Sequence, residues 1–439
     1  MNYQPYPKYR ESGVQWLGEV PEHWAVKRLK LIVRNIDKKV EADEDNPLQY
    51  VGLENIESWY GKLIDLNSDT IPSGIANHFS SKNTLFGKLR PYLAKACNPD
   101  FDGLCSTELI VLEPVELIRR VLLFCLLADG FIKLVNSSAY GTKMPRSNWG
   151  FIGNCLLPQP PKEEQTAIAD FLDSETGRID TLVAKNKKLI ELLKEERSAL
   201  ISLTVTRGLP EDAAIEYGLE PHTRFKDSGV EWLGDVPEDW EVKRLKYSAS
   251  INDEILPETT KPDFDFLYVD IGSVTLLEGI IRKESMTFED APSRARRKAR
   301  AGDAIVSTVR TYLRAIASIP ETDDVLIVST GFAVIRSRLL CPRYLGYALK
   351  ESSFVEQVVA RSVGVSYPAV NASEIGDIAI PLPSENEQTA IADFLDCETG
   401  RIDNLIGKVE ALITRLQEYR IAIITDAVTG KIDVREMAA

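Results

Sequence analysis

The sequence predicts an α+β fold with an internal duplication, in which two α+β domains are joined by a long antiparallel two-helix coiled coil. The first observation behind this prediction is a repeated opening block, since residues 12–30 recur at residues 228–246 with 15 of 19 positions identical. The second is a repeated closing block, because residues 164–180 recur at residues 387–403 with 16 of 17 positions identical. Two long matches in the same order indicate two copies of one structural unit.

The middles between these blocks diverge in sequence but keep matching framework residues. Arg90 aligns with Arg310, Gly141 with Gly364, and Pro145 with Pro368. We therefore expect two copies of one fold that carry different surfaces. The predicted divisions are residues 1–158 for the first domain, 159–208 for the first helix, 209–227 for a linker, 228–383 for the second domain, and 384–439 for the second helix with the C-terminal tail.

Both closing blocks begin a pattern typical of a long helix. Apolar residues recur at alternating spacings of four and three, which is the heptad seam of a coiled coil and requires a partner helix. Ser384 and Glu387 form a predicted capping box at the start of the second helix. Copies related by a pseudo-twofold pair antiparallel, although a single such stripe also suits a helix packed on its own domain. The predicted seam consists of Ile168, Leu172, Ile179, Leu182, Leu189, Leu193, Leu200, Ile391, Leu395, Ile402, Leu405, Val409, Leu412 and Leu416.

The variable middles read as α+β domains. Residues 48–53, 109–112, 266–271, 304–307 and 325–328 have the composition of strands between turn residues, whereas residues 121–127 and 344–359 have a helical pattern. The repeated tryptophans Trp24 and Trp240 are expected to pack structurally where each domain begins.

Basic residues gather at equivalent places in the two middles, although the whole chain has a formal net charge of −14. Lys and Arg neutralise phosphates, and both also read guanine, so two matching patches in an acidic protein predict DNA contacts. The alternative is that these basic residues form a solvent-exposed charged surface without a partner. The candidate DNA-binding residues are Lys82, Lys88, Arg90, Tyr92, Lys95, Lys143, Arg146, Arg294, Arg296, Arg297, Lys298, Arg300, Arg310, Tyr312, Arg314, Ser366 and Tyr367.

The composition and motifs argue against several other classes of protein. The longest apolar run, residues 121–128, is far shorter than the ~20 residues of a membrane helix. The N-terminus has no apolar segment of the secretory type, and the six cysteines form no CxxC pair, so we expect a cytoplasmic protein with reduced thiols and no membrane association. Three scattered histidines predict no metal site, and Walker, methyltransferase and nuclease signatures are missing. The sequence therefore predicts neither an enzyme nor a cofactor site.

A family resemblance follows from these features. The duplicated chain, the two PEHWAVKRLK-type openings and the two EQTAIADFLDSETGRID-type helices resemble the specificity subunit of Type I restriction-modification systems. The Pro-x-Pro…Glu-Gln-x-x-Ile entry to each helix occurs twice, at Pro158, Pro160, Glu164, Gln165 and Ile168 and at Pro381, Pro383, Glu387, Gln388 and Ile391.

That resemblance implies a non-catalytic subunit with two target-recognition domains, each of which reads one half of a split, asymmetric site in double-stranded DNA. It also implies that the helices set the spacing between half-sites and dock two methyltransferase subunits, which bind S-adenosylmethionine and methylate adenine, and that restriction subunits join that core. The loops around Arg90 and Arg310, and those after Gly141 and Gly364, are then the expected DNA contacts. Two alternatives remain open: the recognition subunit of a related methylation-based defence system, and a helical scaffold joining two non-DNA modules.

Overall fold

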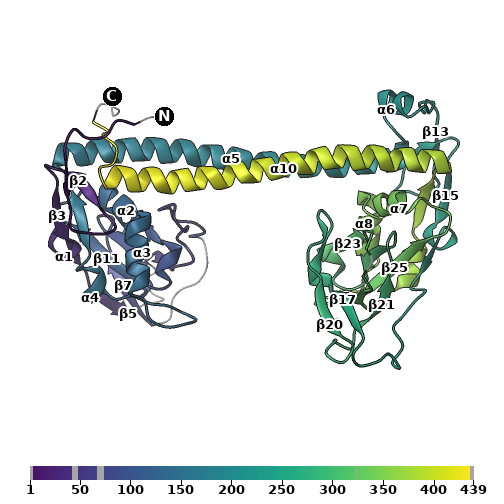
Figure 1. Cartoon of the computed structure of the whole chain (residues 1–439), viewed down its shortest axis with the longest axis horizontal. Helices are drawn as coiled ribbons and strands as arrows, with labels where there is room; N and C mark the ends of the chain where they lie inside the picture. Colours follow the sequence, from purple (N-terminus) through teal and green to yellow (C-terminus); the bar gives the residue numbers. More distant parts are fainter. Residues whose placement is uncertain (1–2, 42–47, 67–73, 323, 436–439) are drawn as a thin grey trace. The chain divides into compact units, whose positions relative to one another are not determined.

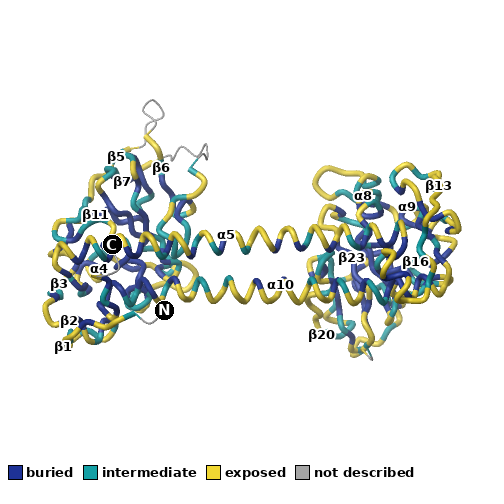
Figure 2. The backbone as a smooth tube through the Cα atoms, turned by 90° about the horizontal axis from the view of Figure 1, so that it is seen from above, coloured by how far each residue is buried: buried dark blue, intermediate teal, exposed yellow. Residues whose placement is uncertain are grey.

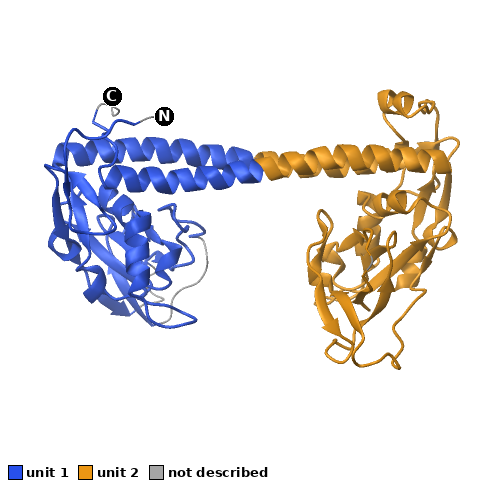
Figure 3. Ribbon diagram, in the orientation of Figure 1, with its two compact units in different colours: residues 1–187, 409–439 blue, residues 188–408 orange. Residues whose placement is uncertain are grey.

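The computed structural model describes residues 3–41, 48–66, 74–322 and 324–435. The chain forms two compact units, of which unit 1 comprises residues 1–187 and 409–439, and unit 2 comprises residues 188–408 (Figure 3). Each unit contains one α+β domain together with part of each of the two long helices, α5 (Lys162–Arg207) and α10 (Glu385–Val428), which are labelled in Figure 1.

The domain of unit 1 is built around two four-stranded sheets. The first has the order β4-β11-β8-β9 and the second the order β5-β7-β10-β6, with a single parallel pair between β10 and β6. The strands of these sheets are β4 (Val33–Asn35), β11 (Leu109–Pro114), β8 (Thr84–Gly87), β9 (Ala96–Cys97), β5 (Lys39–Glu41), β7 (Ile75–Phe79), β10 (Gly103–Cys105) and β6 (Tyr50–Val51). Two strand pairs accompany them, β1 (Tyr9–Glu11) with β2 (Glu19–Pro21), and β3 (Ala25–Arg28) with β12 (Leu156–Gln159).

The domain of unit 2 repeats this plan with one change at a sheet edge. Its first sheet, β16-β25-β22-β23, matches the first sheet of unit 1 strand for strand. Its second sheet, β20-β17-β24-β21, keeps the central three strands but carries its fourth strand, β20, at the opposite edge from β5. The strands are β16 (Ala249–Ile251), β25 (Phe332–Ser337), β22 (Ala304–Ser307), β23 (Ile316–Ser318), β20 (Glu284–Thr287), β17 (Asp265–Val269), β24 (Leu326–Ser329) and β21 (Ala295–Ala299). The smaller pairs are β13 (Phe225–Asp227) with β14 (Asp235–Pro237), β15 (Glu241–Arg244) with β26 (Ala379–Leu382), and β18 (Val274–Thr275) with β19 (Gly279–Ile280).

Short helices accompany the sheets in each domain. Unit 1 contains α1 (Leu29–Ile32), α2 (Arg119–Leu127), α3 (Asp129–Ser137) and α4 (Trp149–Ile152); unit 2 contains α6 (Glu211–Glu216), α7 (Pro342–Ala348), α8 (Ser352–Ala360) and α9 (Ala372–Gly376). The single helix expected over residues 344–359 is therefore wrong. The helix is interrupted between α7 and α8, because the Glu351 carboxylate accepts hydrogen bonds from the amides of Ser353 and Phe354 and so caps the start of a new helix.

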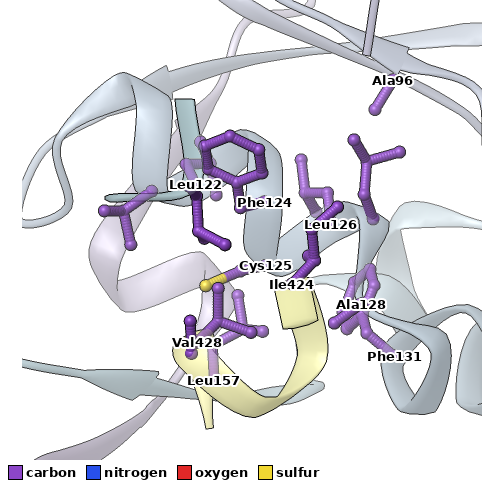
Figure 4. Close-up of a cluster of buried hydrophobic side chains, with 14 of the residues drawn as sticks. Ala96, Leu122, Phe124, Cys125, Leu126, Ala128, Phe131, Leu157, Ile424 and Val428 are labelled. Carbon is purple, nitrogen blue, oxygen red and sulfur yellow. The ribbon is translucent and has the colours of Figure 1, made fainter. Parts of the chain in front are cut away.

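The two long helices run antiparallel within each unit, as predicted. In unit 1 the beginning of α5 and the end of α10 enter one hydrophobic core, where Ile424 and Val428 lie beside the side chains of α2 (Figure 4). In unit 2 the end of α5 and the beginning of α10 share a second core. Two ion pairs at equivalent sequence positions join the helices: Asp180 with Arg420 in unit 1, and Asp403 with Arg197 in unit 2. The duplication predicted from the sequence is thus repeated in these helix contacts.

The seam between the long helices does not follow the predicted heptad along its whole length. Leu189, Leu405 and Leu412 are exposed, and Leu182, Leu200, Ile402 and Leu416 are half-buried, whereas the other predicted seam residues are buried. A heptad keeps one face only if the helix underwinds to 3.5 residues per turn, and a straight helix drifts by about 20° per heptad. The exposed leucines therefore correct the predicted seam. Figure 2, which colours the chain by burial, shows exposed stretches along both long helices.

An 11-residue spacing describes the observed seam better. Isoleucine occupies positions 168, 179, 190 and 201 of α5, and these four side chains are buried. The same spacing gives isoleucine at 391, 402, 413 and 424 of α10, where the two end positions are buried and the two middle ones half-buried. Eleven residues correspond to 3.67 per turn, so the stripe stays on the facing side of a nearly straight helix.

The repeated opening and closing blocks contact each other through one buried carboxylate in each unit. Trp24 Nε1 donates to Glu164 at 2.8 Å, and Trp240 Nε1 donates to Glu387 at 2.9 Å. Both tryptophans are buried, which confirms their structural role. One hydrogen bond of the predicted capping box is present, since Ser384 Oγ accepts from the Glu387 amide at 3.4 Å. The Glu387 side chain instead contacts Trp240 and His222 and does not return to the Ser384 amide.

Candidate nucleic-acid interface

Two loops that are far apart in the sequence meet in the same way in both domains. The Arg90 amide donates to the carbonyl of Pro145 at 2.6 Å, and the Arg310 amide donates to that of Pro368 at 2.7 Å. Isolated bridges from Leu89 to Arg146 and from Val309 to Ala369 continue the match. The predicted Arg loop and the predicted glycine hairpin therefore form one composite surface in each domain.

Backbone conformation shows that this composite surface is held in a special geometry. Arg90 and Arg310 are left-handed, with φ of 48° and 50°. Non-glycine residues adopt this region rarely, and at a cost of order 1–3 kcal/mol, and Ala94 and Arg314, at the other end of the same turns, adopt it as well. The hairpin glycines Gly141 and Gly364 have φ of 100° and 119°, a conformation that favours glycine.

In unit 1 the surface gathers the basic residues Lys88, Arg90, Lys143 and Arg146. Arg90 Nη2 donates to the Lys143 carbonyl at 3.3 Å, which holds the guanidinium against the hairpin. Arg146 forms an ion pair of 2.7 Å with Glu108, so part of its charge is neutralised. Within the described part of the chain, Arg90 Nε and Glu108 Oε2 are buried without a hydrogen-bond partner, which leaves polar capacity unused at this place.

A cavity of about 680 Å³ lies beside this surface in unit 1. Lys88 and Arg146 line it together with Asn77, Tyr140 and Trp149. The side-chain oxygen of Asn77 is buried and accepts no hydrogen bond from any residue that the structure describes. The sequence analysis did not predict Asn77, Tyr140 and Trp149 as site residues, because residues far apart in the chain give no signal that they share a cavity.

In unit 2 the corresponding surface is aromatic as well as basic. The Arg310 guanidinium stacks over the Tyr367 ring at 4.7 Å, a cation–π geometry. Tyr312 and Tyr367 are 54% and 66% exposed, which leaves both rings accessible to a stacking partner. Ser366 is exposed next to Tyr367. Arg314 pairs with Glu356 at 2.6 Å, so Arg310 is the better placed of the two arginines for an external anion.

The remaining basic candidates of unit 2 lie on or beside β21, in the other sheet. Arg300 pairs with Glu254 at 2.5 Å, and Arg294 donates to the Tyr268 hydroxyl at 3.2 Å. Arg296 stacks over Phe288 at 4.7 Å, and burial lowers the pKa of Arg297. Lys298 is half-buried on the same strand. The structure thus separates this strand cluster from the composite surface and engages most of its charges internally.

Within the described ranges, the side chains of Lys82 and Lys95 of unit 1 form no hydrogen bond or ion pair with the composite surface, whereas Tyr92 follows Arg90 as Tyr312 follows Arg310. Lys95 donates to the carbonyl of Leu53 at 2.6 Å, and burial lowers its pKa. Lys82 is exposed in the turn after β7, and Tyr92 is 45% exposed in the short 3-10 turn that follows Arg90. The sequence grouped these residues because they are close in the chain, but Lys95 is engaged by the Leu53 carbonyl.

One group with metal-ligating side chains is held together by short polar contacts. His222, Asp239 and Glu387 place their ligand atoms within 4.8 Å of one another. Glu387 lies 2.6 Å from Nε2 of His222, whereas Asp239 lies 3.4 Å from Nδ1, so the two carboxylates are on opposite sides of the ring. A single ion cannot be bound by both nitrogens of one imidazole, and the arrangement is that of a histidine bridging two acids. Separately, no helix in the described ranges is long and apolar enough to cross a membrane.

A duplicated fold with one loop-built basic surface in each domain defines a two-domain recognition protein. The family model of the Type I restriction modification DNA specificity domain matches residues 21–192 and, a second time, residues 237–413. The chain therefore belongs to the Type I restriction-modification DNA specificity family. This result confirms the family resemblance and the duplicated fold predicted from the sequence.

Relatives match along nearly the whole chain. The specificity subunit of the Type I restriction enzyme MjaVIII from Methanocaldococcus jannaschii is 25% identical over 95% of both chains. The EcoDI specificity subunit from Escherichia coli is 21% identical over 94% of this chain and 90% of its own. A solved structure from work on complex assembly and conformational transition of the type I R-M system matches with a TM-score of 0.63 and 20% identity, over 93% of this chain and 98% of that one, which supports the fold.

Proposed function

We propose that this chain is the sequence-specific DNA-binding specificity subunit of a Type I restriction-modification complex, without catalytic activity of its own. Each domain reads one half of a bipartite, asymmetric site in double-stranded DNA. The observation that carries the proposal is the pair of left-handed arginines, Arg90 and Arg310, each fixed by a proline carbonyl of a glycine hairpin. Arginine recognises guanine through two hydrogen bonds and also binds phosphate, so a rigid arginine at both surfaces suits DNA readout.

The different neighbours of the two arginines support an asymmetric site. Arg90 lies against a hairpin that adds Lys143 and Arg146, whereas Arg310 lies against one that adds Ser366 and Tyr367. The first combination favours phosphates and guanine edges, and the second adds a flat apolar ring and a hydroxyl. Two surfaces with one framework and different side chains fit two different half-sites.

Docking of two methyltransferase subunits, which bind S-adenosylmethionine and are joined by restriction subunits, completes the proposal. Exposed apolar side chains on the long helices support it. In unit 2 Leu189, Leu192 and Leu203 of α5 are 39%, 49% and 58% exposed, and in unit 1 Leu412 and Tyr419 of α10 are also exposed. Rows of large apolar residues on a helix surface are typical of sites that receive partner helices. The heptad leucines that lie outside the seam would thus contact the partner subunits.

Substitution of each arginine tests the reading of half-sites. We expect Arg90→Ala and Arg310→Ala each to weaken binding of the assembled complex to its methylated motif by about 10- to 100-fold, a loss of roughly 1–3 kcal/mol. Each variant should relax specificity in a single half-site, which sequencing of methylated motifs in a host carrying the variant would show. Exposed arginines of the same domains, Arg34→Ala and Arg338→Ala, are the matched controls. Unchanged affinity and motif in both variants would refute the proposed surface, and a purified assembly that ignores DNA at low salt would favour the scaffold alternative.

A further inference from the structure

The two units differ at a buried arginine that joins the long helices. In unit 1 Arg420 pairs with Asp180 and also donates to the carbonyls of Trp59 and Tyr60, at 2.7 and 3.2 Å. The Tyr60 ring stacks on its guanidinium at 4.6 Å. A turn of the first domain, residues 57–61, therefore covers this arginine with two carbonyl oxygens and an aromatic ring.

The same turn rests on two leucines of α2. A Cβ built on Gly61 would stand 3.1 Å from Leu127 Cδ1 and 3.2 Å from Leu123 Cδ2, so the turn is in close contact with both. In the duplication Leu123 and Leu127 correspond, at an offset of 223, to Gly346 and Lys350. The covered surface of unit 1 thus has a counterpart in unit 2 with altered side chains.

That counterpart is open. Arg197, the equivalent of Arg420, pairs with Asp403 through Nε and Nη2 and makes no other hydrogen bond with a described residue. The hairpin of β18 and β19 has residues 276–278, Leu-Leu-Glu, in place of the aromatic turn, and none of the three lines this surface. A cavity of about 610 Å³ lies here instead, lined among others by Arg197, Gly346 and Lys350. This volume is in the usual range for a ligand pocket.

Lys350 gives the open cavity a chemical preference. Its ammonium forms no salt bridge or hydrogen bond with any residue in the described ranges, although Lys350 is half-buried. Its nearby charges are Arg197, Asp396 and Asp403. Burial, together with the neighbouring Arg197, lowers the pKa of Lys350 to about 8. A half-buried cation that no carboxylate contacts directly is costly, and an anionic group that enters the cavity and pairs with it would reduce that cost.

We propose that the cavity of unit 2 receives an acidic, aromatic turn of a partner polypeptide, which does for Arg197 what residues 57–61 do for Arg420. Carbonyl oxygens of the turn complete the hydrogen bonds of Arg197, its ring stacks on the guanidinium, and its carboxylate pairs with Lys350. The proposal rests on the proposed function, in which the chain assembles with other subunits. A partner would thus occupy in unit 2 the place that residues 57–61 occupy in unit 1.

The test uses the full chain and a pentapeptide copied from residues 57–61, acetyl-Glu-Ser-Trp-Tyr-Gly-amide. The readout is acetylation of lysines by a limiting amine reagent, measured by mass spectrometry, with the exposed Lys408 as the reference amine. We expect saturating peptide to slow labelling of Lys350 at least tenfold and to leave Lys408 unchanged. A peptide with Gln in place of Glu should need about tenfold more to protect, because charge-assisted hydrogen bonds are roughly twice as strong as neutral ones.

Two variants sharpen this test. Lys350→Leu introduces the residue that unit 1 has at the equivalent place, so it should fold, and it should bind the Glu and Gln peptides equally by fluorescence anisotropy. Ala301→Trp, at an exposed position of the cavity rim, should abolish binding of both. Absence of peptide protection, or equal protection by inorganic phosphate alone, would overturn the proposal. DNA binding measured on the same samples separates the outcomes, because loss of DNA binding with intact peptide protection would refute the proposed function and leave this cavity assignment standing.

Discussion

In the first domain Arg90 donates to the Lys143 carbonyl, whereas in the second domain Arg310 stacks on the Tyr367 ring. Both arginines have the same left-handed backbone and the same hydrogen bond to a proline carbonyl. The difference lies in the side chains around them, among them Thr-Lys-Met against Val-Ser-Tyr in the hairpins, and Arg146 against Ala369. A framework of glycine, proline and a strained arginine can therefore hold one geometry while its neighbours change the chemistry that it offers.

A second comparison concerns the arginines that join the helices, and it gives the largest expected effect. Arg420→Ala removes a buried guanidinium with acceptors on Asp180, Trp59 and Tyr60, and should destabilise unit 1 by about 3–5 kcal/mol. Arg197→Ala removes one ion pair at the edge of an open cavity and should cost about 1–2 kcal/mol. Thermal denaturation of the full chain should show two transitions shifted unequally. Equal shifts would mean that the turn at residues 57–61 adds nothing to Arg420.

The seam of the long helices offers the next largest effect. Ile190 is buried on the 11-residue stripe, whereas the neighbouring Leu189 is 39% exposed on the heptad stripe. Ile190→Ala should cost about 2–4 kcal/mol by chemical denaturation, as expected when a large side chain is removed from a core. Leu189→Ala should cost less than about 1 kcal/mol, in the range of surface substitutions. A larger loss of stability in Leu189→Ala than in Ile190→Ala would mean that the seam follows the heptad spacing.

These helices also show what the sequence can and cannot predict. Duplication and apolar spacing were enough to predict two long antiparallel helices, because the spacing is a local property of each helix and two copies of one helix pair antiparallel about a pseudo-twofold. The exact seam was missed because leucines at 182 and 189 fit a heptad and only the drift of a straight helix separates the two spacings. The isoleucines at intervals of 11 carried that signal in the sequence.

The candidate interface was predictable in part for a similar reason. Alignment of the halves paired Arg90 with Arg310 and Gly141 with Gly364, and the structure brings each pair of loops together. The acids that neutralise Arg300 and Arg314 could not be foreseen, since Glu254 and Glu356 are more than 40 residues away in the chain. The left-handed backbone of two arginines also has no sequence signature, because only glycine announces positive φ.

Lys350 distinguishes the open cavity of unit 2 from its leucine-lined counterpart, and it should make stability depend on pH. Its pKa of about 8 in the folded chain is below that of an unfolded lysine, about 10.4. Between these values the unfolded chain binds more protons, so stability of the native chain should rise as pH increases from 8 to 10. Lys350→Leu should be more stable than the native chain by about 1–2 kcal/mol at pH 7, and this advantage should shrink toward pH 10. Urea denaturation at both pH values measures it, with Lys408→Ala as a variant that should show no such trend; a constant difference would contradict the assigned burial.

The smallest expected effect concerns the salt dependence of DNA affinity, which distinguishes a phosphate contact of one hairpin from a base contact of the other. Lys143 is an exposed cation beside Arg90, whereas Tyr367 contributes an uncharged ring beside Arg310. Each phosphate contact made by a cation releases counterions, so Lys143→Ala should reduce the slope of log affinity against log salt by about 1. Tyr367→Ala should lower affinity for the correct site but leave that slope unchanged, since no charge is removed. Binding titrations of the assembled complex over a range of salt concentrations would show this, and an equal slope in both variants would mean that Lys143 does not reach the DNA backbone.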